Sequence, residues 1–436
     1  MEWNSLLVKE RFKSNEASFD EYGRTGFQRD IDRIIFSSSF RRLQGKTQVH
    51  PLPKNDHVHN RLTHTLEVSC VGRTLGTTLG KELLKNGYLP KGIAPDELGS
   101  ITQAACLAHD IGNPPFGHAC ETIIGDWFSK NSKIASILSD NERKDLSFFD
   151  GNAQGFRIIT RNEYHFNEGG MRLSYPVLAS YLKYPWTPLN SPKKEKSSCF
   201  YSEVDYLELV AEKVGLLKKG ENIWCRHPLA YLVEVADDIC YRIIDIEDGM
   251  ELGIISENEY LDILKISSSN KMEISAPGLA RREFFSNRGR VFQRIIDSAI
   301  EVFMENYSTI LSGGLQGSLL DRVHVDDVEI IKNASDAAKK KLFTDRKKTL
   351  IEIGVAKNIS GTLEIFTDAV LDYYVAQKER RSPSQISNKI IGHVSSEGFQ
   401  MPKSAYAGLR GVVDYVAGMT DSYATFVARQ FHGFGM

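Results

Sequence analysis

An adjacent histidine and aspartate, His109 and Asp110, stand at the end of an apolar stretch with helical character. Gly112, Pro114 and Pro115 follow, and a helix must end there because proline lacks an amide donor and clashes with the preceding turn. An imidazole and a carboxylate at one helix end can bind a single metal ion if other segments supply the remaining ligands. The sequence therefore predicts a metal-centred site, and the other ligands must come from elsewhere in the chain.

A second histidine and an acid, His118 and Glu121, follow the turn at a spacing of i, i+3. Side chains at this spacing are neighbours on a helix, so the carboxylate can orient the imidazole. An oriented imidazole is suited to proton transfer at a reacting group. We expect His118 to be a proton-transfer residue and not a metal ligand.

Two helical segments could carry ligands toward His109 and Asp110. Near-helical apolar spacing before Asn86-Gly87 predicts a first helix, which includes Arg61 and His64. A lone histidine in such a helix is more often a satisfied core residue than a ligand. The apolar positions are Leu62, Leu66, Cys70, Leu75, Leu79 and Leu83.

The apolar residues of 228–250 recur at i, i+3, i+4 and i+7, and this spacing predicts another helix with one apolar face. Asp237, Tyr241 and Asp245 line up along the flank of that face, whereas Asp238 points away from it. Asp237 is therefore the better candidate for a ligand. The alternative is that all the acids on this helix are solvated.

Residues 24–46 carry six basic side chains and two acidic ones, a net charge of +4. Such a run is usually a solvated face with local ion pairs, but Gly45 and the polar, aromatic mix around Arg41 also suit a loop that faces phosphate. The whole chain of 436 residues has a net charge of −2, so any phosphate site must come from a local patch.

Composition places the chain among globular proteins, with 41% hydrophobic and 25% charged residues. The six cysteines form no Cys-x-x-Cys pair, so buried thiols are expected. No apolar run has the length of a signal peptide or a membrane span. We therefore expect the protein in the cytoplasm and do not expect it to bind a membrane.

The architecture is predicted to be mostly α, with one large helical body over 1–436. We expect an exposed loop at 187–198 and a second loop at 267–277. We also expect a lysine-rich helical surface at 338–348 and one final helix over 412–424 that contains Gly418.

One histidine, a His-Asp pair and an aspartate on three separate helices form the pattern of the HD-domain metal phosphohydrolases. The chain resembles one branch more closely, the deoxyguanosine triphosphate triphosphohydrolase family. The resemblance is carried by Arg33-Ile-Ile-Phe-Ser-Ser-Ser-Phe-Arg-Arg-Leu-Gln-Gly-Lys-Thr-Gln-Val49, His109-Asp-Ile-Gly-Asn-Pro-Pro-Phe-Gly-His118, Ala236-Asp-Asp-Ile-Cys-Tyr241 and Asp414-Tyr-Val-Ala-Gly-Met-Thr-Asp421. These blocks span nearly the whole chain, and the resemblance implies an HD-domain helical fold at 60–250 embedded in the single helical body.

The resemblance implies that His64, His109, Asp110 and Asp237 bind one divalent ion, and this nitrogen and oxygen set suits Mn²⁺ or Mg²⁺. It also implies hydrolysis of deoxynucleoside triphosphates, with dGTP as the default, to deoxynucleoside and tripolyphosphate. The substrate contacts it implies are Arg61 at a phosphate, Lys183 and Tyr184 at the outer phosphates, Gln44 and Asp245 at the 3′-hydroxyl, and Tyr241 against the sugar ring.

Other hypotheses about the function stay open. An HD phosphodiesterase or nucleotidase acting on other nucleotides would use the same metal site. A non-catalytic nucleic-acid-binding HD protein could use the lysine-rich surface, and single-stranded nucleic acid could also modulate an active enzyme. Family resemblance implies a homo-oligomer, either a hexamer or a tetramer, and some family members need a nucleotide activator.

Overall fold

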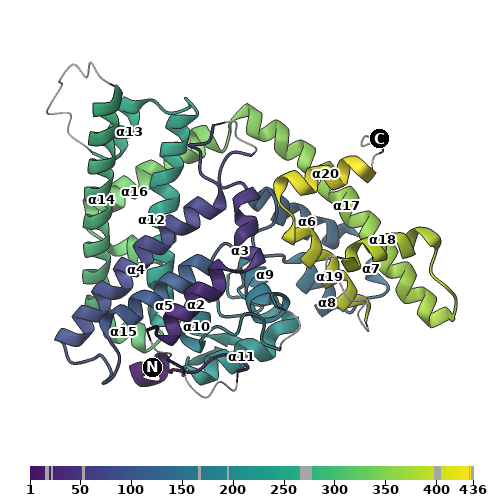
Figure 1. Cartoon of the computed structure of the whole chain (residues 1–436), viewed down its shortest axis with the longest axis horizontal. Helices are drawn as coiled ribbons and strands as arrows, with labels where there is room; N and C mark the ends of the chain where they lie inside the picture. Colours follow the sequence, from purple (N-terminus) through teal and green to yellow (C-terminus); the bar gives the residue numbers. More distant parts are fainter. Residues whose placement is uncertain are drawn as a thin grey trace.

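The computed structural model describes residues 1–14, 19–20, 23–51, 55–164, 168–193, 196–265, 277–396, 404–431 and 433. This part of the chain is almost entirely helical, as the sequence predicts (Figure 1). Its strands, β1 (Lys218–Gly220) and β2 (Ile223–Trp224), form one short antiparallel pair. None of the described helices is both long and apolar enough to cross a bilayer.

The helices fall around two groups of buried apolar side chains. The first group unites α2 (Gly26–Ile35), α4 (Arg61–Lys85), α5 (Pro95–Ala108), α10 (Tyr175–Tyr181), α11 (Val204–Lys213), α12 (Pro228–Glu251), α13 (Glu257–Ile263), α14 (Pro277–Glu305) and α16 (Val325–Ala337). The second unites α6 (His118–Lys130), α8 (Asp140–Ser147), α17 (Arg346–Glu379), α18 (Gln385–Ser396), α19 (Ala405–Gly418) and α20 (Asp421–Phe431). In Figure 1 the helices around the first group lie on the left of the molecule and those around the second lie on the right. We call them the first and second core.

Shorter helices connect these elements. They are α1 (Trp3–Leu6), α3 (Ser38–Arg42), η1 (Leu43–Gly45), α7 (Ser132–Ala135), α9 (Gly151–Arg157), η2 (Ile158–Asn162), η3 (Pro188–Asn190), η4 (Tyr201–Glu203), α15 (Tyr307–Leu311), η5 (Leu319–Arg322) and η6 (Ala338–Leu342).

Three glycines let α4 and α5 pack with their backbones in close contact. A Cβ atom at Gly76 would lie 2.5 Å from the Leu98 carbonyl oxygen, and one at Gly80 would lie 2.7 Å from Pro95 Cα. Gly72 faces Cys106 in the same way, at 2.4 Å from its Sγ. Any larger residue at these positions would push the two helices apart. Because α4 carries His64 and α5 ends next to His109, this packing sets the distance between the two histidines.

The predicted helix ends agree with the structure. The first helix ends at Lys85, two residues before Gly87 with φ +71°, and the predicted 228–250 helix is α12. The apolar face predicted for α4 is partly wrong, because Leu66 is 42% exposed and Cys70 is exposed. The other five cysteines are buried, as expected.

The C-terminal prediction of one helix over 412–424 is wrong. The chain forms α19 and α20, separated by Met419 and Thr420, and Met419 is in the extended region. The loop expected at 267–277 lies outside the described residues, apart from Pro277 at the start of α14. The segment 187–198, expected to be exposed, is buried at both ends and is exposed at Pro192 and Lys193; residues 194–195 lie outside the described part.

The basic segment is used in two ways. Arg24 pairs locally with Asp32 at 2.8 Å, whereas Arg33 donates to the carbonyl of Met171 in a segment distant in the sequence. Lys46, in contrast, is buried inside the protein, with only 3% of its surface exposed. A lysine-rich surface is present as predicted, with Lys339, Lys340 and Lys341 exposed.

Candidate active site

Three predicted ligands from α4, the end of α5 and α12 meet at one point. His64 Nε2 lies 3.3 Å and His109 Nε2 lies 3.5 Å from the same Asp237 oxygen, Oδ1. One ligand atom from each of the three residues lies within 4.8 Å of the others. Atoms at these separations can share one ion with bonds of about 2 Å.

The protonation of His109 is set by its surroundings. Its Nδ1 donates a hydrogen bond of 2.6 Å to the carbonyl of Cys106, which leaves Nε2 to face Asp237. Burial lowers the pKa of His109, but Asp110 and Asp237 overcome this effect and raise it to about 9. Burial likewise opposes ionisation of Asp237, yet His109 and His64 hold its pKa well below the usual range. The carboxylates of Asp110 and Asp237 therefore favour a positive charge beside them.

Asp110 lies beside this group of three and not within it. Its Oδ1 is 3.6 Å from His109 Nε2, but it accepts a hydrogen bond of 2.9 Å from Arg61 and another from Asn113. Burial raises the pKa of Asp110, but Arg61, His109 and His64 together lower it below its ordinary value. Its second oxygen, Oδ2, is buried and, within the described residues, has no hydrogen-bond partner.

These atoms fit a metal ion. Within the described part of the chain, His109 Nε2 and Asp110 Oδ2 are buried without a hydrogen bond, a state that costs free energy unless another group satisfies them. The donor set is imidazole and carboxylate with no thiolate, which suits a divalent ion such as Mn²⁺ or Mg²⁺ better than structural zinc.

His118 and Glu121 form the predicted pair at the start of α6. His118 Nδ1 lies 2.7 Å from Glu121 Oε2, and the other carboxylate oxygen accepts from the Gly151 amide at 2.9 Å. The His118 side chain is 81% exposed, whereas Glu121 is 10% exposed. Burial opposes ionisation of Glu121, but the hydrogen bond with His118 lowers its pKa below the usual value. A buried carboxylate thus orients an imidazole that is open to solvent.

Two cationic side chains, which the sequence predicts to contact phosphate, lie beside the carboxylates of this site. Arg61 is buried at 8% exposure and contacts Asp110, and Lys183 lies 3.6 Å from Glu234 and 5.9 Å from the centre of the Tyr184 ring. Burial lowers the pKa of Lys183, but Glu234 and Asp237 raise it above its ordinary value, so this lysine is charged.

Two further cations stand near the same ring, and sequence reasoning missed them. The Arg226 guanidinium lies 5.9 Å from the centre of the Tyr184 ring and 2.7 Å from Glu234, and the Lys193 ammonium lies 5.7 Å from the ring centre. No helical period connects these segments, so only the fold brings the two side chains together.

The predicted sugar contacts are partly assembled. Asp245 is 1% exposed, its Oδ2 is without a partner in the described chain, and burial raises its pKa well above the usual value. Tyr241 is half-buried, with its ring centre 6.4 Å from that of Phe343. Gln44 lies on η1 and is exposed, and among the described residues no hydrogen bond joins it to the Tyr241 and Asp245 face.

Asp238, expected to point away from the core, lies outside the metal group but is not solvated. It pairs with Arg242 at 2.8 Å, and its side chain is 19% exposed, against 28% for Asp237. Helical phase therefore predicted correctly which acid faces the histidines, whereas it overestimated how far the other one turns into solvent.

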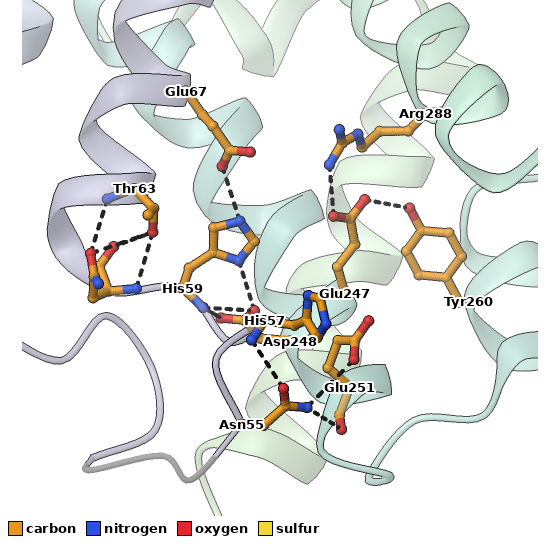
Figure 2. Close-up of polar contacts among 11 residues, drawn as sticks. Asn55, His57, His59, Thr63, Glu67, Glu247, Asp248, Glu251, Tyr260 and Arg288 are labelled. Atoms are coloured by element: carbon orange, nitrogen blue, oxygen red, sulfur yellow. Dashed lines mark hydrogen bonds and ion pairs between the residues drawn. The ribbon is translucent and has the colours of Figure 1, made fainter. Parts of the chain in front are cut away.

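A polar cluster, not anticipated from the sequence, supports α12 behind this site (Figure 2). His59 lies between two carboxylates, 2.8 Å from Asp248 on α12 and 3.3 Å from Glu67 on α4. Burial lowers the pKa of His59, but hydrogen bonds to Asp248 and Glu67 raise it to about 10. A charged histidine therefore ties the two ligand-bearing helices together.

Comparisons with known proteins agree with this geometry. Residues 61–184 match the HD domain, and residues 365–430 match a phosphohydrolase-associated domain. The chain is 41% identical over 444 residues, 99% of each chain, to a deoxyguanosinetriphosphate triphosphohydrolase-like protein of Pseudomonas aeruginosa. A protein of Synechocystis sp. with the same description is 34% identical and covers 100% of both chains. A deoxyguanosinetriphosphate triphosphohydrolase of Yersinia enterocolitica is 29% identical over 96% of both chains.

Proposed function

The chain belongs to the deoxyguanosinetriphosphate triphosphohydrolase-like branch of the HD-domain phosphohydrolases, and from this premise we propose that it hydrolyses deoxynucleoside triphosphates in a metal-dependent reaction. The observation that carries the proposal is the convergence of His64, His109 and Asp237 from three helices, with Arg61 held against Asp110 beside them. This arrangement provides a cation site next to a fixed guanidinium, which is what a phosphate ester needs.

A divalent ion, Mn²⁺ or Mg²⁺, held by these three residues with Asp110 beside them would polarise a phosphoryl oxygen and lower the pKa of water. In this proposal Arg61 binds a phosphate, and Lys183 and Tyr184 bind the outer phosphates. Arg226 and Lys193, which lie around the same Tyr184 ring, add positive charge there.

The proposed reaction begins when a water molecule attacks the α-phosphorus. The bond to the 5′ oxygen breaks, that oxygen takes a proton, and the products are deoxynucleoside and tripolyphosphate. Proton transfer falls to His118, which Glu121 orients and which solvent reaches. We assign Gln44 and Asp245 to the 3′-hydroxyl and Tyr241 to the face of the sugar ring.

Product analysis tests the proposal. Each of the four deoxynucleoside triphosphates is incubated with the metal-loaded protein, with and without a second nucleotide, and the phosphorus products are separated. We expect tripolyphosphate, with dGTP as the default substrate. Orthophosphate, pyrophosphate or monophosphate products would instead support the alternative of a phosphodiesterase or nucleotidase.

The proposal also includes a homo-oligomer, a hexamer or tetramer, acting in the cytoplasm, where its substrates are. Light scattering measures the size of the oligomer, and the product assay with and without a second nucleotide shows whether an activator is needed. Adding single-stranded nucleic acid to the product assay tests whether it modulates the activity. The exposed Lys339, Lys340 and Lys341 are the candidate contact for it.

A further inference from the structure

The second core contributes one carboxylate to the edge of the candidate active site. Asp421, the first residue of α20, is 2% exposed and ends the motif that begins at Asp414. Its Oδ1 accepts a hydrogen bond of 2.8 Å from the Phe116 amide. Its Oδ2 accepts from the Thr47 amide at 3.0 Å and from the Thr47 hydroxyl. One side chain thus joins α20 to the turn before His118 and to the segment that follows Gln44.

The turn that Asp421 contacts has a strained backbone. Phe116 has φ +59° and Gly117 has φ +57°, two consecutive residues in the left-handed region. A bulky residue such as phenylalanine rarely adopts this conformation, which persists only when surrounding contacts enforce it. The Phe116 amide is held by Asp421, and its ring is buried in the second core.

A buried lysine provides a second support from the same helices. Lys46 Nζ donates to the carbonyl of Asn113, in the turn, at 2.5 Å and to the carbonyl of Ala417, in α19, at 2.8 Å. Gly45 lies against Thr420, where a Cβ atom would be 2.7 Å from the threonine side chain. The junction between α19 and α20 therefore contacts both the turn and the segment at 45–47.

A purely structural role, capping α20, does not account for Asp421. The cap is supplied by Thr420, whose hydroxyl accepts from the Tyr423 amide at 3.2 Å. Asp421 directs both oxygens to other segments instead. The turn it holds ends at His118, and at Gly117 it approaches Arg61 so closely that a Cβ atom would lie 2.6 Å from Nη2.

We propose that Asp421, assisted by Lys46, is a positioning residue that holds the strained turn and thereby places His118 for proton transfer. The inference rests on the proposed function of His118. Among its described hydrogen bonds Asp421 contacts none of His64, His109 and Asp237, so we expect the metal to bind when Asp421 is replaced.

Hydrogen exchange tests the support without reference to activity. In Asp421→Asn, an amide group replaces one acceptor, so the Phe116 or the Thr47 amide faces a donor. We expect exchange in peptides covering 112–118 to rise by about tenfold or more. Asp372→Asn is the matched control, because Asp372 on α17 also accepts from a backbone amide, that of Ser384 at 2.8 Å, but lies far from the turn in sequence and contacts Arg381. Unchanged exchange at 112–118 in Asp421→Asn overturns the inference.

A double-mutant cycle then tests the path to His118. Asp421→Asn should lower kcat by roughly 10–100-fold, with KM and metal content unchanged. It should cause no further loss in the His118→Ala background, because the group it positions is gone. Losses that multiply would show that Asp421 acts elsewhere and would overturn the inference.

The outcomes separate the two proposals. A wild type that releases no tripolyphosphate contradicts the proposed function, whereas the exchange comparison still decides the support of the turn. If Asp421→Asn does not fold, Lys46→Met removes the second support, and unchanged exchange at 112–118 in that variant counts equally against the inference.

Discussion

Two adjacent carboxylates on α12 have different surroundings and should have different functions. Asp237 faces His64 and His109, whereas Asp238 pairs with Arg242, and burial raises the pKa of Asp238 to about 6. Asp237→Ala should reduce metal affinity by more than the roughly 10–100-fold typical of an outer-sphere partner. Asp238→Ala should leave it unchanged. Metal content after dialysis measures both, and metal retained in the first variant but lost in the second would contradict the assignment.

Tyr241 is the residue that we expect to distinguish deoxyribose from ribose. It lies one helical turn from Asp237 and one from Asp245, whose buried Oδ2 offers an acceptor for a hydroxyl group. A ring against the 2′ face leaves an added hydroxyl unpaired, which costs about 1–3 kcal/mol. Tyr241→Ala should therefore lower the ratio of kcat/KM for dGTP over GTP by about 5–150-fold. If Tyr241 only supports the helix, a folded variant will keep the ratio, and circular dichroism checks the folding.

At the scale of the helices, the sequence predicted what depends on local period and end signals. The α12 phase identified Asp237, and Asn86-Gly87 marked the end of α4. The close contacts at Gly72, Gly76 and Gly80 cannot be predicted from the period of apolar side chains, because a glycine contact depends on the partner helix. The break between α19 and α20 was also missed, since Gly418 is compatible with a helix and the break depends on what Asp421 contacts.

His59 ties α4 to α12, and its charge makes this tie dependent on pH (Figure 2). The pKa of His59 is about 10 in the folded chain, raised from 6.5 by hydrogen bonds to Asp248 and Glu67 that overcome the effect of burial. A raised pKa means that the stabilisation is complete below about 6.5 and is lost as pH rises through about 10.

His59→Gln should therefore lower the free energy of unfolding by about 1–3 kcal/mol near neutral pH and by much less above pH 10. Denaturant unfolding at the two pH values gives the difference between wild type and variant. The exposed His57, on the same segment, provides the control His57→Gln. A difference that stays constant with pH would show that the histidine acts through packing and not through charge.

At the scale of the whole molecule, the candidate site lies where the two cores meet. The metal ligands belong to helices of the first core, and His118 and Glu121 belong to α6 in the second. The contacts between them join residues far apart in the chain, such as Arg157 with Asp414 at 2.9 Å and Lys46 with Ala417. No local pattern encodes such pairs, which is why the sequence predicted the residues of the site but not Arg226, Lys193 or the support from α19 and α20.

This division predicts that metal binding stabilises one part of the molecule selectively. An ion that binds His64, His109 and Asp237 joins α4, α5 and α12, and it has no ligand on α17–α20 among the described residues. Mn²⁺ at 100 times its dissociation constant should stabilise the fold by about 2.7 kcal/mol and raise Tm by about 3 °C for a chain of this length. Hydrogen exchange with and without Mn²⁺ should then slow in peptides from α4, α5 and α12, while peptides from α17–α20 stay unchanged. Asp237→Ala should abolish the effect, because the oxygen shared by both histidines is lost. Uniform protection of both cores would instead mean that the ion couples them directly, and protection that persists in Asp237→Ala would place the metal elsewhere.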